Sequence, residues 1–296
     1  MAGCREAAIA EPVVLGVLGG TGLYDVEGLE VLDRLDLRTP FGRPSGPIVI
    51  GRLEGKRVAF LARHGEGHRL NPSQVNYRAN IYALRSIGIE RVVAVSACGS
   101  LRAEIEPGRL VVPDQLFDLT RQRARSFFDE DLVVHLSAPD PFCPALSARL
   151  ATAAEAAGAA VTRGGTSITI EGPRFSTRAE SHTFQGWGMS IIGMTTSPEA
   201  FLAREAEMCY AVLAHVTDYD VWHVEERPVT VEVVVQQLRQ NAARAEAALR
   251  QLLRELPFPR DCTCPAALKD AFITPPSSLS PQARARLGVL VDHYLG

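Results

Sequence analysis

The chain lacks the features that would place it on a nucleic acid or in a membrane. Its 31 Lys and Arg residues are outnumbered by 34 Asp and Glu residues, so the basic excess of a nucleic-acid-binding protein is missing. No apolar run reaches the roughly 18 residues that span a bilayer. Glu6 and Glu11 precede the first apolar stretch, unlike the uninterrupted apolar segment of a secretory signal. We therefore expect a cytoplasmic protein without a nucleic-acid or membrane partner.

Cysteine is also scarce, with six residues in 296. In a cytoplasmic chain these are expected to be reduced rather than to form a disulfide framework. The C-x-C pair of Cys262 and Cys264 is the one exception that stays open. Apolar residues make up 46% and charged residues 22%, which is the composition of an ordinary globular protein.

Short apolar runs that are rich in β-branched residues predict buried strands. They are VVLGVL (13–18), PIVIGRL (47–53), RVAFLA (57–62), RVVAVSA (91–97), TSITIEG (166–172), MSIIGM (189–194) and YAVLAHV (210–216). Helical patterns alternate with them, which indicates an α/β fold. We predict a single-domain mixed β-sheet core flanked by helices over residues 12–256, and a C-terminal helical extension over residues 257–296.

Capping residues locate the starts of the predicted helices. Asn71 followed by Pro72 predicts a helix that ends at Gly88, and Ser197 followed by Pro198 predicts another. The pattern of residues 145–157 predicts a helix that also stops at a glycine. The longest helix begins near Thr230, because apolar residues recur at steps of three and four from there to Leu253.

The stretch GVLGGTGLYD, residues 16–25, raises the question of a dinucleotide-binding turn. In the pattern G-x-G-x-x-G that starts at Gly20, the third position holds Asp25 instead of glycine, and no clean helix follows. A tight turn with exposed main-chain N–H groups and the hydroxyl of Thr21 suits a lone anion better. A structural turn without a ligand is the alternative.

Two further strand ends carry polar residues. Arg63 and His64 follow a predicted strand, where a planar guanidinium fork and a neighbouring imidazolium could hold a phosphate. Ser96 ends another strand and could donate to an anion. Cys98 is better explained as a small apolar residue than as a nucleophile, because no activating base stands beside it.

The second half of the chain adds candidates for binding a flat ring. Phe175 could stack on such a ring or belong to the core. Main-chain donors and hydroxyls before the helix at Ser197 suit an anion, and Glu199 in its first turn is favoured by the helix dipole. Asp218 and Asp220 lie one residue apart, and on an extended chain both point to the same side. If they are pressed together, the pKa of one of them should rise.

Nine segments in this order resemble the 5′-methylthioadenosine phosphorylase family of the trimeric purine nucleoside phosphorylase superfamily. They are GGTGL, TPFGRPS, RHGEGH, NYRANI, SACGSLR, PGRLVVPDQ, TSITIEGPRFSTRAES, MTTSPEA and TDYDVW, and the likeness runs from about Val14 to about Leu252. It implies cleavage of methylthioadenosine by inorganic phosphate, giving adenine and methylthioribose 1-phosphate. It also implies no metal or organic cofactor, and assembly as a homotrimer or homohexamer.

The resemblance assigns roles to individual residues. It places phosphate at Thr21, Arg63, His64, Ser96, Ala97 and Thr195. It places the nucleoside at Cys98, Gly99, Phe175, Ser176, Met194, Asp218, Tyr219, Asp220 and Val231, with the two aspartates at the purine edge as catalytic groups. Asp218 is the expected acid for the purine N7 and the residue that selects a 6-amino purine. His68 is expected to approach the sugar from a neighbouring subunit.

Four points stay open. Gly193 stands where many relatives carry Asn, so a broader specificity that includes adenosine or methylthioinosine stays open. A purine nucleoside phosphorylase acting on 6-oxo purines or methylthioinosine is the alternative activity. A non-catalytic purine-binding protein on the same fold is the alternative of another class. The tail CTCPAALKDAFITPP resembles versions from thermophiles, which implies that the C-x-C pair can be oxidised.

Overall fold

A mixed β-sheet forms the centre of the molecule. The computed structural model describes residues 11–19, 26–223 and 231–295, except the side chains of 231–241 and Pro276. The strands of this part are β1 (Leu15–Gly19), β2 (Glu30–Leu35), β3 (Ile48–Leu53), β4 (Lys56–Ala62), β5 (Arg91–Ser100), β6 (Leu110–Val112), β7 (Gln115–Asp118), β8 (Val161–Arg163), β9 (Thr166–Thr169), β10 (Ile191–Gly193) and β11 (Cys209–Asp218). The helices are α1 (Tyr77–Ser86), α2 (Pro144–Ala156), α3 (Arg178–Gly186), α4 (Thr196–Glu205), α5 (Val231–Glu255) and α6 (Pro281–Val291).

The sheet branches at β5. The main path runs β2-β3-β4-β1-β5-β10-β9-β7, while β11 also pairs with β5 and carries β6 and then β8. β1, β4, β5 and β11 are mutually parallel where they pair, and β10 is antiparallel to the far end of β5. The mixed sheet and the α/β class predicted from the sequence are therefore confirmed.

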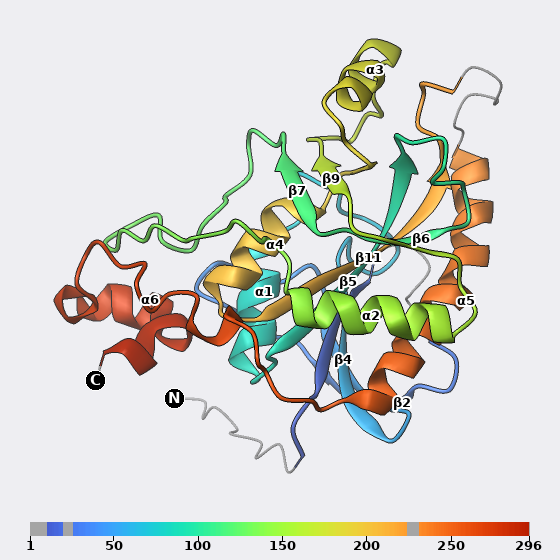
Figure 1. Cartoon of the computed structure of the whole chain (residues 1–296). Coiled ribbons are helices and arrows are strands. Elements are labelled where there is room, and N and C mark those ends of the chain that lie inside the picture. The colour runs from blue at the N-terminus through green and yellow to red at the C-terminus, as the bar shows by residue number, and fades with distance from the viewer. Residues whose placement is uncertain (1–10, 20–25, 224–230, 296) are drawn as a thin grey trace.

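Helices cover both faces of the sheet (Figure 1). Side chains of successive strand residues point to opposite faces. On β5, Val93 and Val95 pack with the cluster that holds α2 and α5, while Val92 and Ala94 pack with the cluster that holds α1, α4 and α6. Alternate burial on both faces explains the continuous apolar strands seen in the sequence.

The C-terminal extension shares the core of the rest of the chain. α6 lies beside α1, and five buried residues of the extension join the same apolar cluster as the sheet. They are Leu268, Ala271, Leu287, Leu290 and Val291. The extension and the rest of the chain therefore share an apolar core, and the boundary at residue 257 stays a prediction.

Two helix starts differ from the sequence prediction. α1 begins at Tyr77, and its cap is Asn76, whose side chain accepts the N–H of Ala79. Asn71 instead accepts the N–H groups of residues 73 and 74 and closes a local turn. Ser197 has the extended φ and ψ of −100° and 138° expected of a cap, but its Oγ is buried without a partner in the described part of the chain.

Several elements were missed because their sequence patterns are weak. β2 is almost wholly exposed, and β6, β7 and β8 are three or four residues long. α3 has a capping box formed by Thr177 and Glu180, which the sequence contains as T-x-x-E.

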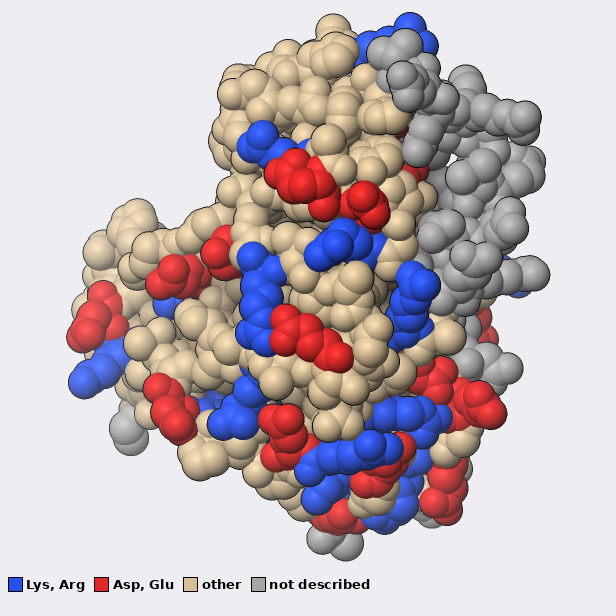
Figure 2. Space-filling view, turned by 45° about the vertical axis from the view of Figure 1, so that its right-hand side comes forward, with Lys and Arg blue, Asp and Glu red and all other residues tan. Residues whose placement is uncertain are grey.

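Within the described residues, no helix is both long and apolar enough to cross a membrane. On the face shown in Figure 2, acidic and basic side chains are interspersed.

Candidate active site

The predicted phosphate residues lie on neighbouring strands: Arg63 and His64 follow β4, whereas Ser96 lies within β5, although the sequence predicted that it ends a strand. Gly19 at the end of β1 lies opposite Val95 of β5. The main-chain N–H of Arg63, just after β4, donates to the carbonyl of Gly19 at 2.9 Å. The carboxyl ends of these strands therefore meet at one edge of the sheet, where α/β proteins bind ligands. This places Arg63 and His64 near Ser96.

Arg63 is buried at this edge, with 1% of its surface exposed. Its Nε and Nη2 donate to the carboxylate of Glu199 at 2.8 and 2.9 Å. Nη1 and Nη2 donate to the carbonyls of Val95 and Leu18 at 3.1 and 3.2 Å. Burial lowers the pKa of Arg63, but the charge and hydrogen bonds of Glu199 outweigh this effect and raise it. Arg63 is thus a charged anchor that joins β1, β4, β5 and α4.

This arrangement adds partners that the sequence did not reveal for Arg63 and Glu199. The guanidinium fork of Arg63 was expected to face phosphate, but both of its edges are engaged by protein acceptors. Glu199 lies in the first turn of α4, as predicted, but it is also fully buried and forms the ion pair with Arg63, which the sequence did not indicate. The two residues lie 136 positions apart, so only the fold could reveal the contact. A phosphate role for Arg63 stays a prediction.

The sequence predicted that His64 is a charged imidazolium, but its surroundings favour a neutral ring. Its Nδ1 lies 2.9 Å from the carbonyl of Leu70, to which it can only donate, so Nε2 carries the lone pair. Burial, and next the charge of Arg63, lowers the pKa of His64 to about 4. The ring of His68 stacks on it at 4.3 Å. At neutral pH, Nε2 of His64 can therefore accept a hydrogen bond from a ligand but cannot donate one.

Smaller groups stand around the same edge. Ser96 is buried, whereas the neighbouring Ala97 is exposed. Thr195 occupies the N-cap position of α4, and its hydroxyl makes no capping bond to the described residues. A Cβ on Gly193 would lie 3.8 Å from the carbonyl oxygen of Ala97, which places the start of α4 beside β5. A helix start with a hydroxyl suits an anion.

Asp218 and Asp220 gather around Gly99. Asp218 ends β11 opposite Gly99, and its Oδ1 accepts the main-chain N–H of Asp220 at 2.8 Å. Its Oδ2 accepts the hydroxyl of Thr217. A Cβ on Gly99 would lie 3.0 Å from Oδ1 of Asp218 and 3.3 Å from Cβ of Asp220. The absence of a side chain at Gly99 therefore gives the two aspartates their room.

The sequence predicted that Asp218 and Asp220 lie on one extended strand. In the structure they do not. Asp220 lies in the turn after β11 with a φ of 52°. The rise in pKa that we expected for one carboxyl falls on Asp220. Burial raises its pKa and the charge of Asp218 adds to the rise, partly offset by Ser181. Oδ2 of Asp220 is buried without a hydrogen-bond partner in the described part of the chain.

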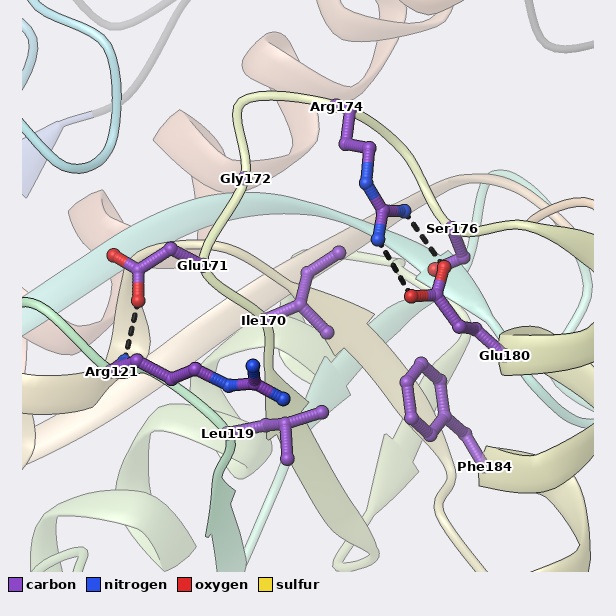
Figure 3. A pocket seen from close by; sticks show the side chains of 9 residues that line it. All are labelled: Leu119, Arg121, Ile170, Glu171, Gly172, Arg174, Ser176, Glu180 and Phe184. Carbon is purple, nitrogen blue, oxygen red and sulfur yellow. Dashed lines mark hydrogen bonds and ion pairs between the residues drawn. The ribbon is translucent and has the colours of Figure 1, made fainter.

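A cavity of about 270 Å³ lies between the end of β9 and α3 (Figure 3). Of the predicted site residues, Ser176 lines it, and the exposed Phe175 is its neighbour in the chain. Gly172, with a φ of 65°, also lines the cavity, and a Cβ on it would lie 2.6 Å from Sδ of Met194. The cavity and the predicted ribose and base residues are therefore contiguous.

The remaining predicted residues are placed less directly. The side chain of Cys98 is buried in the apolar core, and burial raises the pKa of its thiol, in agreement with the apolar interpretation. The hydroxyl of Tyr219 donates to the carbonyl of Ala103 at 3.2 Å. Thr21 and the side chain of Val231 lie outside the described residues.

Sequence reasoning missed Arg123, a buried cation behind the site. Its Nη1 donates to the carbonyls of Met194 and Ser197 at 2.7 Å each, and its Nη2 donates to that of Glu171 at 2.7 Å. These bonds fix the chain on both sides of Thr195. In the sequence, Arg123 stands among several arginines of a loop, and nothing there distinguishes it.

Comparison with known proteins identifies the family of this chain. The model of the phosphorylase superfamily matches residues 14–254. An S-methyl-5′-thioadenosine phosphorylase of Geobacter sulfurreducens is 48% identical over 95% of this chain and 99% of its own length. The structure of a methylthioadenosine phosphorylase from an antarctic soil metagenomic library is 42% identical, with a TM-score of 0.90 over 95% of this chain and 99% of that one.

A third relative has been solved with a ligand. It is the methylthioadenosine phosphorylase of Schistosoma mansoni in complex with adenine, which is 35% identical with a TM-score of 0.79. The similarity covers 82% of this chain and 92% of that one. The chain belongs to the phosphorylase superfamily and, within it, to the methylthioadenosine phosphorylase family.

Proposed function

We propose that this protein cleaves 5′-methylthioadenosine with inorganic phosphate, giving adenine and 5-methylthioribose 1-phosphate. The observation that carries the proposal is that the predicted phosphate residues of β5 and a carboxylate pair lie at one edge of the sheet. Ser96 and Asp218 are only three positions apart in strand register, because Asp218 lies opposite Gly99 on β5. A phosphate and a purine can therefore lie on either side of one sugar.

Phosphate is held by hydroxyls and main-chain N–H groups. We assign it to Ser96, Ala97 and Thr195, together with Thr21 and with Arg63 as a buried positive charge. The neutral Nε2 of His64 would accept a hydrogen bond from the O–H of hydrogen phosphate, which keeps its proton, and this bond would orient the remaining oxygens toward C1′. Positioning and electrostatic stabilisation of a cation-like C1′ then supply most of the acceleration.

The aspartate pair acts on the departing purine. Adenine leaves poorly as an anion, so N7 must be protonated as the glycosidic bond breaks. We assign Asp218 as the acid at N7 and as acceptor of the exocyclic amino group. The raised pKa of Asp220 lets the pair retain a proton, and such coupled carboxyls titrate as a unit. Acceptance from a 6-amino group favours adenine over 6-oxo purines.

Apolar and aromatic residues complete the proposed substrate site. Phe175 and Ser176 border the base, Met194 lies at the ribose, and Val231 is assigned to the methylthio group. Cys98, Gly99 and Tyr219 line the site through the main chain and through shape. We expect no metal or organic cofactor in the reaction. The expected assembly is a homotrimer or homohexamer in the cytoplasm, with a role in purine and methionine salvage.

A substrate panel tests the proposal. Methylthioadenosine, adenosine and methylthioinosine are each incubated with the protein in the presence and absence of phosphate, and base release is measured. We expect phosphate-dependent release of adenine from methylthioadenosine. Preference for methylthioinosine would instead support a phosphorylase of 6-oxo purines, and release without phosphate would indicate a hydrolase.

A further inference from the structure

Four cysteines from three distant segments meet at one point of the fold. Cys143 is the N-cap of α2 and Cys209 is the first residue of β11. Cys262 and Cys264 belong to the C-terminal extension, which follows α5. All four sulfur atoms lie within 4.8 Å of one another, and those of Cys209 and Cys262 are 3.4 Å apart.

This spacing is that of a tetrahedral metal site. Zinc binds thiolates at about 2.3 Å, which puts the sulfurs of a tetrahedral site about 3.8 Å apart. A disulfide needs about 2.05 Å, and the structure gives all four cysteines as free thiols. A set of four soft sulfur ligands without carboxylates favours zinc over magnesium or calcium.

The surroundings fit a charged, closed site. Cys143, Cys209 and Cys264 are buried, and Cys262 is partly exposed. Arg260 lies beside Cys209 and Cys262, and its Nε is buried without a hydrogen-bond partner in the described part of the chain. A zinc ion with four thiolates carries a net charge of about −2, which one neighbouring arginine partly offsets.

The main chain holds two of the ligands in fixed positions. The N–H of Cys143 donates to the carbonyl of Tyr210, and the N–H of Cys209 donates to that of Glu90, each at 2.8 Å. Two ligands therefore come from rigid parts of the core, and the other two are brought by the extension.

The cysteine group lies far from the proposed active site. Cys209 pairs with Arg91 at the start of β5, whereas Asp218 pairs with Gly99 at its other end. At about 3.3 Å per residue, these ends of β11 are separated by about 30 Å. All four positions of a tetrahedral ion would be filled by protein, which is typical of structural rather than catalytic zinc.

We propose that Cys143, Cys209, Cys262 and Cys264 bind one zinc ion, which fastens the C-terminal extension to the start of β11 and α2. Binding replaces up to four thiol protons by the metal and involves no oxidation or reduction. The proposal is independent of the reaction at the other edge of the sheet. It also gives the C-x-C pair a role that needs no disulfide.

The test is the metal content of the full chain, purified under reducing conditions and without chelator. We expect about one zinc per chain by mass spectrometry of the metal, and cobalt exchanged into the wild-type protein should show the absorption of a tetrahedral thiolate complex. Cys262→Ser and Cys264→Ser should each lower the zinc content at least tenfold under a competing chelator. Cys98→Ala, which removes a thiol at the other end of β5, should keep the zinc.

Two results would overturn the proposal. One is wild-type protein without zinc, even after incubation with zinc and reductant. The other is wild-type protein whose four thiols resist alkylation until they are reduced, because this would show two disulfides. The cobalt spectrum is recorded on wild-type protein, so poor folding of a serine variant does not affect that result.

Discussion

Neutralising Glu199 should destabilise the protein far more than neutralising an exposed acid. In Glu199→Gln the amide keeps the size of the side chain and an acceptor for the hydroxyl of Tyr210, which donates to Glu199 at 2.8 Å. The charge of Arg63 would then be buried without a counterion. Removing one partner of such a pair costs about 3–5 kcal/mol.

A matched control is available on the surface. Glu255 pairs with Arg149 at 3.4 Å, and their side chains are 35% and 44% exposed. Glu255→Gln should therefore lower the free energy of unfolding by less than about 1 kcal/mol. Urea denaturation of both variants at a fixed protein concentration measures the difference. Equal midpoints for the two variants would refute the role of Glu199 as the counterion of a buried Arg63.

A double variant separates the effect of Arg63 on stability from its effect on phosphate binding. Arg63→Met combined with Glu199→Leu removes both charges and should recover part of the stability that Glu199→Gln loses. If Arg63 also contributes to the phosphate site, the KM for phosphate of this double variant should be higher than that of the wild-type protein. Recovery of both stability and phosphate KM would limit Arg63 to a structural role.

Three further outcomes are expected. Asp218→Asn should lower kcat on methylthioadenosine by about 10²–10⁴-fold, and a rate near that of the wild type would reject Asp218 as the acid. Gly99→Ala should reduce kcat/KM by about tenfold or more, since its Cβ would lie within 3.0–3.3 Å of Asp218, Ile192 and Asp220. Gly46→Ala is its control, because a Cβ there meets nothing within 4 Å. Burial lowers the pKa of His215 to about 4, so its unfolded form binds more protons below pH 6.5, and stability should fall as the pH drops from about 6.5 to about 4. His215→Leu should flatten this fall in urea denaturation measured at pH 7 and pH 5, and an unchanged slope would contradict the prediction.

The order of strands and helices could be predicted because each element depends mainly on the apolar pattern of its own residues. Runs such as 91–97 and 210–216 are apolar enough to be buried on both faces, and the structure contains strands there. The exposed β2 and the three-residue β6 and β8 carry too little pattern to be recognised. α1 begins five residues later than the sequence predicted. The sequence offers both Asn71 and Asn76 as caps, and the structure uses Asn76.

The candidate site was predictable in its residue types but not in its contacts. Polar residues at strand ends indicated the edge of the sheet where Arg63, Ser96 and Asp218 lie. Their protonation and pairing depend on partners far away in the sequence. The neutral state of His64 arises from burial and from Arg63, and the orientation of Arg63 is set by Glu199.

The sequence alone determined the α/β class and the positions of the main strands, because these depend on near neighbours in the chain. Tertiary structure decided which charges are neutralised, where Asp220 turns and that four separated cysteines meet. The physical reason is that burial, electrostatic pairing and metal-ligand geometry depend on distances in space, which local sequence does not contain.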